Sequence, residues 1–193
     1  MRIILITLFL SSQLAIGKAY FLPLMPRDNT VEFLGDCISV VNPLLGIATI
    51  FYHEDIDGFG ELFLTEATTI VSTELLKAVF DKANFFGYQP GRRPNGSRKN
   101  FPSGHTATAF AASQFVYKRY GPKMGIPLTV LSIFTGVSRI YAHKHDIIAV
   151  MGGAAIALFA AEIFVKSFKN SSSNLLLNFD GRNLLLAFQL SSF

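Results

Sequence analysis

The stretch "NFPSGHTATAF", residues 100–110, decides the fold that this sequence predicts. Small and apolar residues follow His105, so an apolar helix is expected to begin with an imidazole. Ser103 stands where a helix N-cap belongs, and Gly104 would let a bound group approach the backbone closely. Free amides and the positive end of the helix dipole meet at this point. The stretch therefore indicates an apolar helix with an anion site at its start.

The composition favours a membrane protein with a single domain. The chain has 193 residues, of which 50% are hydrophobic and 16% are charged, whereas soluble chains carry about 25% charged residues. The mean hydropathy of +0.39 is moderate for a protein with several membrane spans. Cys37 is the only cysteine, so it cannot form a disulfide within the chain.

Five segments have the length and apolar character of helices that could cross a bilayer about 30 Å thick. They cover about residues 38–52, 61–80, 103–120, 124–141 and 147–165. We therefore predict an all-α fold, a multi-helix membrane bundle with five core helices within residues 20–169. A soluble all-helical bundle is the alternative.

The two ends of the chain are expected to lie outside this bundle. Residues 1–19 contain one Arg, an apolar run and small residues, which fits a secretory signal or an uncleaved first membrane helix. Residues 170–193 form a tail in which Asp180 and Gly181 separate two apolar runs. This pattern allows a hairpin, and a short helix or a frayed end are alternatives.

The distribution of basic residues gives a topology for the bundle. The formal net charge is +4. If the helices alternate across a membrane, the basic segments 117–123 and 165–169 fall on one side, as the positive-inside rule requires. The Arg-rich loop 82–99 and the turn 143–146 then fall on the outer side, where binding of phosphate would explain the positive charge. The loop lacks the aromatic pattern of nucleic-acid modules, so no nucleic-acid partner is expected.

Three clusters on this outer side contain residues that could bind a phosphate group and catalyse its transfer. They are "GRRPNG" at 91–96, "PSGH" at 102–105 and "SRIYAHKHD" at 138–146. Arg93 and Arg139 could each present a bidentate fork to phosphate oxygens. One His could attack phosphorus while another protonates the leaving oxygen. The segments contain no cluster of carboxylates for a pair of metal ions, so a reaction without a metal or another cofactor is expected.

These clusters resemble the three motifs of the type 2 phosphatidic acid phosphatase superfamily, which are Lys-x6-Arg-Pro, Pro-Ser-Gly-His and Ser-Arg-x5-His-x3-Asp. The second motif is complete, and the first is present as Arg93-Pro94. The third is present as Ser138, Arg139 and His145, in the right order and spacing. The superfamily includes membrane lipid phosphatases, soluble bacterial acid phosphatases and vanadium haloperoxidases, and this chain is most similar to the lipid enzymes.

The resemblance implies a role for each matched residue. His145 would be the nucleophile that forms a phosphohistidine, and His105 would protonate the leaving group. The phosphoryl oxygens would be held by a Lys together with Arg93, Ser103, Gly104 and Arg139. Neutralising charge in this way is usually the largest single contribution to catalysis.

The Lys of the first motif is displaced in this chain. It is expected at position 86, where the sequence has Phe86. Lys77 and Lys82 are the candidates. Glu66, Thr69, Thr73 and Lys77 follow each other at helical steps of three and four, which predicts a polar stripe that ends at the outer surface. We therefore assign the position to Lys77; a surface pair between Lys77 and Glu74 is the alternative interpretation.

The Asp of the third motif, which orients the nucleophilic His, is absent. Position 149 is Ala149, and Asp146 directly follows His145 instead. We predict that Asp146 takes the catalytic position, with a cap on the last helix as the alternative. Without any replacement the tautomer of His145 would be poorly fixed.

The sequence therefore predicts a phosphatase of membrane lipids at the outer, periplasmic face of a bacterial inner membrane. The expected substrates are an anionic phospholipid, a prenyl diphosphate or the phosphates of lipid A. A soluble periplasmic acid phosphatase is the alternative within the superfamily, and a membrane protein that only binds anionic lipid is the alternative outside enzymes. The sequence does not indicate an oligomeric state.

Overall fold

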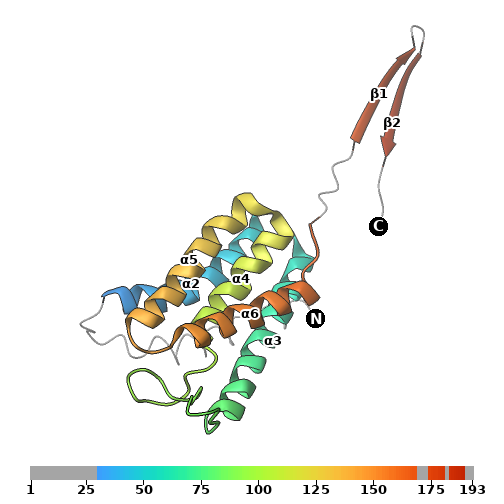
Figure 1. The fold of residues 1–193 in the computed structure, drawn as a ribbon. Coiled ribbons are helices and arrows are strands. Elements are labelled where there is room, and N and C mark those ends of the chain that lie inside the picture. Colours follow the sequence, from blue (N-terminus) through green and yellow to red (C-terminus); the bar gives the residue numbers. More distant parts are fainter. Residues whose placement is uncertain (1–29, 169–173, 181–182, 190–193) are drawn as a thin grey trace.

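The computed structural model describes residues 30–168, 174–180 and 183–189. The described residues form five helices and two strands (Figure 1): α2 (Thr30–Tyr52), α3 (Ile56–Phe80), α4 (Gly104–Tyr120), α5 (Pro122–Tyr141), α6 (Ile147–Phe164), β1 (Asn174–Asp180) and β2 (Asn183–Gln189). β1 pairs with β2 in an antiparallel register that places Asp180 opposite Asn183. The predicted signal or first helix at 1–19 lies outside the described residues.

The predicted bundle of five core helices is confirmed, and the largest difference lies at the start of the bundle. The first helix was expected near residue 38, and α2 begins at Thr30. Glu32 and Asp36 interrupt the apolar run in this extra part, yet both side chains are buried inside the bundle. The start of α2 was therefore missed in the sequence because its polar residues face the interior of the bundle.

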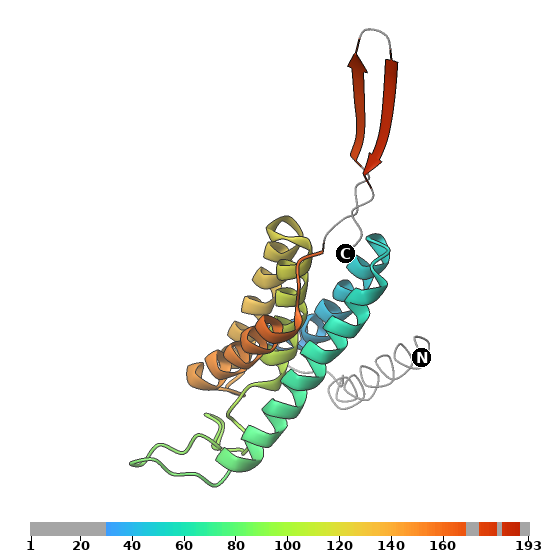
Figure 2. The ribbon, with the colours of Figure 1, turned by 90° about the vertical axis from the view of Figure 1, so that its right-hand side faces the viewer.

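Helix α4 is the centre of the bundle. It packs against α2, α3, α5 and α6, which surround it in Figures 1 and 2. Four of its alanines, Ala107, Ala109, Ala111 and Ala112, are fully buried. Small side chains let neighbouring backbones approach closely, which is how helices associate in a membrane.

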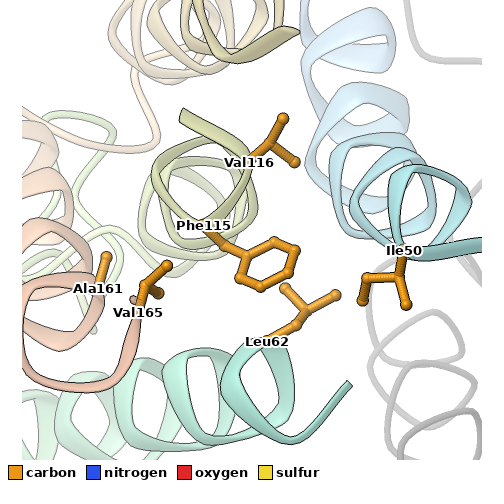
Figure 3. Close-up of a cluster of buried hydrophobic side chains, with 6 residues drawn as sticks. All are labelled: Ile50, Leu62, Phe115, Val116, Ala161 and Val165. Atoms are coloured by element: carbon orange, nitrogen blue, oxygen red, sulfur yellow. The ribbon is translucent and has the colours of Figure 1, made fainter. Parts of the chain in front are cut away.

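An apolar cluster fills one half of the bundle. It contains Ile50, Leu62, Phe115, Val116, Ala161 and Val165. Figure 3 shows Leu62 of α3 between the ring of Phe115 of α4 and the side chain of Ile50 of α2. This cluster joins α2, α3, α4 and α6 through the packing of apolar side chains rather than through hydrogen bonds.

Hydrogen bonds replace apolar contacts in the middle of the bundle. Asn42 of α2 donates to the carbonyl oxygens of Ala109 and Leu128 and to the hydroxyl of Ser132. Ser132 of α5 in turn donates to the carbonyl oxygen of Ala109 and lies 3.0 Å from the hydroxyl of Ser113. Polar side chains thus connect α2, α4 and α5 where lipid would offer no partner.

Three of the helices are long and apolar enough to cross a membrane: α2, α5 and α6. Their large apolar side chains that face outward include Val130 of α5 and Phe159 of α6. The chain is therefore a membrane protein, as the composition predicted.

A buried ion cluster closes the end of the bundle where α4 meets α5. Arg119 of α4 bonds both carboxylate oxygens of Asp55, and it also donates to Glu61 at 2.7 Å. Tyr120 donates to Asp55 at 2.7 Å, and the carbonyl oxygen of Lys166 accepts from Arg119 at 3.1 Å. One guanidinium therefore ties α4 to the α2–α3 turn and to the segment that follows α6.

We predict that Arg119→Ala lowers the stability of the fold by about 3–5 kcal/mol, because it leaves two carboxylates near the protein interior without their partner. The measurement is the thermal unfolding midpoint in detergent. Lys118→Ala is the matched control, because its partner Glu162 is 76% exposed, and exposed pairs contribute about 0–1 kcal/mol. Equal losses in the two variants would contradict a structural role for the Arg119 cluster.

Candidate active site

His145 lies at the opposite end of the bundle, in the turn between α5 and α6, and it is buried. Its Nδ1 lies 2.6 Å from the backbone carbonyl oxygen of Asn100. A carbonyl oxygen can only accept a hydrogen bond, so Nδ1 must carry the proton. The other ring nitrogen, Nε2, then has the free electron pair that a nucleophile needs.

The surroundings keep this imidazole neutral. Burial and then the positive charge of Arg93 lower the pKa of His145 to about 3, with smaller contributions in the same direction from His105 and Lys77, while the hydrogen bond to the Asn100 carbonyl oxygen acts in the opposite direction. An exposed His has a pKa near 6.5. The ring is therefore uncharged at neutral pH, and the same interactions show that Arg93, His105 and Lys77 lie close enough to act on it.

His105 is the second residue of α4, and its Nε2 lies 3.1 Å from Oδ1 of Asp36. The same carboxylate oxygen accepts a hydrogen bond from Nη1 of Arg139. Arg139 is only 2% exposed, and it also donates to the backbone carbonyl oxygen of Glu32 and to the hydroxyl of Ser138. Asp36 thus joins the predicted acid and one predicted phosphate ligand in one buried network.

This network requires α2 and α5 to approach each other closely. A Cβ atom added to Gly35 would collide with the hydroxyl of Ser138 and would lie 2.8 Å from Nη2 of Arg139. A glycine at position 35 is therefore what allows Asp36 to reach Arg139.

The start of α4 lies against α6. Ser103 occupies the N-cap position, although its side chain makes no capping bond; its hydroxyl instead accepts from Thr106 at 3.0 Å. The backbone amide of Ser103 donates to the carbonyl oxygen of Ala149 at 2.9 Å. A Cβ atom at Gly153 would collide with the Ser103 carbonyl oxygen, so this glycine lets α6 approach the site.

The two candidate lysines differ in position. Lys77 is buried at the end of α3, and its charge acts on the pKa of His145. It also donates to Glu74 at 2.6 Å, so the pair that the alternative interpretation expected is present as well. Lys82 is exposed in the loop beyond α3. The structure therefore brings Lys77, and not Lys82, toward the buried histidines.

Arg93 lies in the α3–α4 loop and is partly exposed. Its side chain donates to the carbonyl oxygen of Lys99 at 3.4 Å, which fixes the loop around it. The amide of Asn95 in the same loop donates to the carbonyl oxygen of His143. The loop with the first motif is thus attached to the turn that carries the third.

Asp146 is the N-cap of α6, and its Oδ1 accepts from the amide of Ala149 at 2.7 Å. Its other oxygen accepts from Asn100 at 3.0 Å and from the hydroxyl of Tyr88 at 2.9 Å. These bonds place the carboxylate beside the Asn100 side chain, whereas the ring of His145 donates to the Asn100 backbone carbonyl oxygen.

Sequence reasoning missed two of these residues. Asp36 could have been found, because Asp36, Ser39 and Asn42 recur at steps of three on α2, just as the polar residues of α3 do. Asn100 gave no such signal, because the group that reaches His145 is a backbone carbonyl.

A family model described as "PAP2 superfamily" matches residues 59–173, which is more than half of the chain. The chain belongs to the PAP2 superfamily. This confirms the predicted family, and the relatives within it confirm the predicted enzyme class, a phosphoric ester hydrolase. Asp36 lies before the residues that match the PAP2 model.

Among PAP2 relatives, the chain is 33% identical to a lipid A 4'-phosphatase of Helicobacter pylori strain J99 over 165 residues, which cover 84% of this chain and 83% of the relative. It is 27% identical to a lipid A 1-phosphatase of Helicobacter pylori strain 26695, over 76% of this chain and 80% of the relative. The crystal structure of Aquifex aeolicus LpxE has the same fold, with a TM-score of 0.56 at 19% identity, and the match covers 78% of this chain and 92% of that one.

We predict that Asp36→Asn destabilises the protein and lowers its activity, because Arg139 loses the negative charge that compensates its burial. Removing one partner of a buried pair costs about 3–5 kcal/mol. The loss in Asp36→Asn should be smaller, because the amide oxygen can still accept a hydrogen bond from Arg139. Glu162→Gln is the control, since this carboxylate is 76% exposed in its ion pair with Lys118. Thermal unfolding in detergent checks both variants, and an Asp36→Asn variant as stable as Glu162→Gln would contradict this account of the network.

Proposed function

We propose that the chain hydrolyses a phosphate ester of a membrane lipid through a phosphohistidine on His145. The observation that carries this proposal is the hydrogen bond from Nδ1 of His145 to the Asn100 carbonyl oxygen, which leaves Nε2 as a neutral nucleophile. The PAP2 match and the phosphatase relatives support the same reaction, since a phosphohistidine is general to the superfamily.

The reaction has two steps. In the first, Nε2 of His145 attacks phosphorus, the bond from phosphorus to the lipid oxygen breaks, and that oxygen takes a proton from His105. In the second, water attacks phosphorus and gives a proton to the now neutral His105, while the bond from phosphorus to Nε2 breaks. Inorganic phosphate leaves, and both imidazoles return to their starting states.

The phosphoryl oxygens would be held by groups from three helix ends and one loop. These groups are the side chains of Lys77, Arg93 and Arg139, the hydroxyl of Ser103 and the backbone amide of Gly104. The amide and the helix dipole at the start of α4 favour an anion there. Charge neutralisation by preorganised donors is the main source of rate in such a site.

Asp36 would support the acid in this mechanism. A carboxylate beside an imidazole offsets part of the cost that burial imposes on the protonated form, which is the form that a general acid needs. Asp36 also holds Arg139, so one residue of α2 would position both groups.

The substrate we propose is a lipid A phosphate. Both Helicobacter relatives carry lipid A phosphatase activity in their names, and together they cover most of this chain. The outward apolar side chains of α5 and α6 suit the acyl chains of such a lipid, and the exposed Arg92 and Lys99 near the site suit an anionic head group. A prenyl diphosphate or an anionic phospholipid would be handled by the same groups and belongs in the test.

We also propose that the site faces the periplasm from the inner membrane. The carbonyl oxygen of Arg119 accepts from the amide of Phe168, so the segments that carry Lys118 and Lys166 lie at the end opposite His145. The positive-inside rule assigns that end to the cytoplasm.

The test is phosphate release in detergent with a chelator present, from four substrates: bisphosphorylated lipid A, undecaprenyl diphosphate, phosphatidylglycerophosphate and p-nitrophenyl phosphate. We expect release from lipid A, and a loss of at least about 1,000-fold in His145→Ala, because the nucleophile is gone. His143→Asn is the control: this His is exposed, and Asn tolerates the positive φ of 53° found there. Its activity should stay within about threefold of the wild type.

Other results would point elsewhere. Release from the soluble ester alone would favour an acid phosphatase, and release from another lipid would replace lipid A as the substrate. Activity that survives in His145→Ala would contradict the mechanism, and no release from any substrate would favour a protein that only binds anionic lipid.

A further inference from the structure

The nucleophile of this chain lacks the carboxylate that its family motif provides. Position 149 is Ala149, which is fully buried, and its amide and carbonyl groups are both used in bonds to Asp146 and Ser103. The only hydrogen bond that the described residues show for the ring of His145 is the one that Nδ1 donates to the Asn100 carbonyl oxygen. The residues that hold the Asn100 carbonyl oxygen in position therefore also set the orientation and the tautomer of the His145 ring.

Asn100 is held from two directions. Its side chain is fully buried, and its backbone amide donates to the carbonyl oxygen of Gly91 at 3.1 Å. Its side chain exchanges two hydrogen bonds with Asp146: Nδ2 donates to the carboxylate at 3.0 Å, and Oδ1 accepts from the Asp146 amide at 3.1 Å. This pair of bonds joins the loop before α4 to the start of α6.

Tyr88 completes the group from the α3–α4 loop. Its hydroxyl donates to the same carboxylate oxygen of Asp146 that accepts from Asn100. Burial and this hydrogen bond raise the pKa of Tyr88 to about 12, so the hydroxyl keeps its proton at neutral pH and remains a donor. Asp146 therefore accepts from Tyr88, Asn100 and Ala149 together.

We propose that Asn100, Asp146 and Tyr88 form a positioning clamp that replaces the missing carboxylate of the family motif. Asp146 acts through Asn100: it holds the Asn100 side chain, and the Asn100 carbonyl oxygen fixes the tautomer and the orientation of His145. The proposal rests on the proposed function for its effect on catalysis, while the geometry of the clamp can be tested without a substrate.

A purely structural role for Asp146 makes a different prediction. Asn is as good an N-cap as Asp, so Asp146→Asn should leave α6 and the protein unchanged if the residue only caps the helix. In the clamp the same variant is defective. The substituted side chain has a single oxygen, which can accept from the amide of Ala149 or from Nδ2 of Asn100 but cannot replace both carboxylate oxygens.

The double variant Asn100→Asp with Asp146→Asn should restore the clamp. The carboxylate now lies on residue 100, where its oxygens can accept from the backbone amide and the side-chain amide of residue 146. The side-chain oxygen of the substituted residue 146 can still cap α6. The exchange therefore keeps both hydrogen bonds between residues 100 and 146 while moving the charge to the other partner.

Two measurements test the clamp. The first is the proton resonance of Nδ1–H of His145 in detergent, which should be strongly downfield in the wild type, since the bond is 2.6 Å long, and is assigned by its loss in His145→Ala. This resonance should weaken or shift in Asp146→Asn and return in the double variant.

The second measurement is hydrolysis of bisphosphorylated lipid A. Here kcat should fall about 10- to 100-fold in Asp146→Asn with KM little changed, as for other residues that orient a functional His. The double variant should recover most of this loss.

Tyr88→Phe is a second test of the clamp, which can be used even if Asp146→Asn does not fold. Tyr88 is 39% exposed, so its loss should leave the fold intact while it shifts the Nδ1–H resonance and lowers kcat a few-fold. A wild-type resonance and wild-type kcat in Asp146→Asn would overturn the clamp, and so would a double variant that is no better than the single one. Because the resonance needs no substrate, a chain that releases no phosphate would overturn the proposed function without deciding against the clamp.

Discussion

The hydrogen bond between Nδ1 of His145 and the Asn100 carbonyl oxygen is the interaction on which the site depends. It joins the loop before α4 to the turn before α6, so it can form only where these two helices start side by side. Gly153 provides this closeness, because any larger residue would meet the carbonyl group of Ser103. The packing of two apolar helices therefore decides which ring nitrogen of His145 carries a proton.

The low dielectric of the bundle explains why its two buried arginines occur in networks. An unpaired charge inside a protein is very costly, so a buried Arg needs partners that reach it at short range. Arg119 and Arg139 meet this requirement at opposite ends of the bundle, with Asp55 and Asp36 as their respective partners. At one end the network only joins helices. At the other it includes His105, so the same electrostatic constraint also serves the chemistry that we propose.

Much of this architecture could be predicted from the sequence. The period of the polar residues on α3 indicated an inward stripe that ends at Lys77, and Lys77 is indeed buried with its charge acting on His145. The same reasoning would have found Asp36, but the first eight residues of α2 were not recognised as helix, since their acidic side chains resemble those of a loop. The Asn100 carbonyl could not be predicted, because every residue has a carbonyl group and only the fold decides where one points. The catalytic roles of the motif residues remain predictions.

The nitrogen that receives the phosphoryl group tests this account most directly. The measurement uses His105→Ala with p-nitrophenyl phosphate, whose leaving group needs no acid, so that the phosphoenzyme forms but its hydrolysis is slowed. The protein is then digested under alkaline conditions, and the phosphohistidine isomer is identified by phosphorus NMR and mass spectrometry. We predict phosphate on Nε2 of His145, because Nδ1 carries the proton bonded to Asn100. Phosphate on Nδ1 of His145, or on any other residue, would contradict the account.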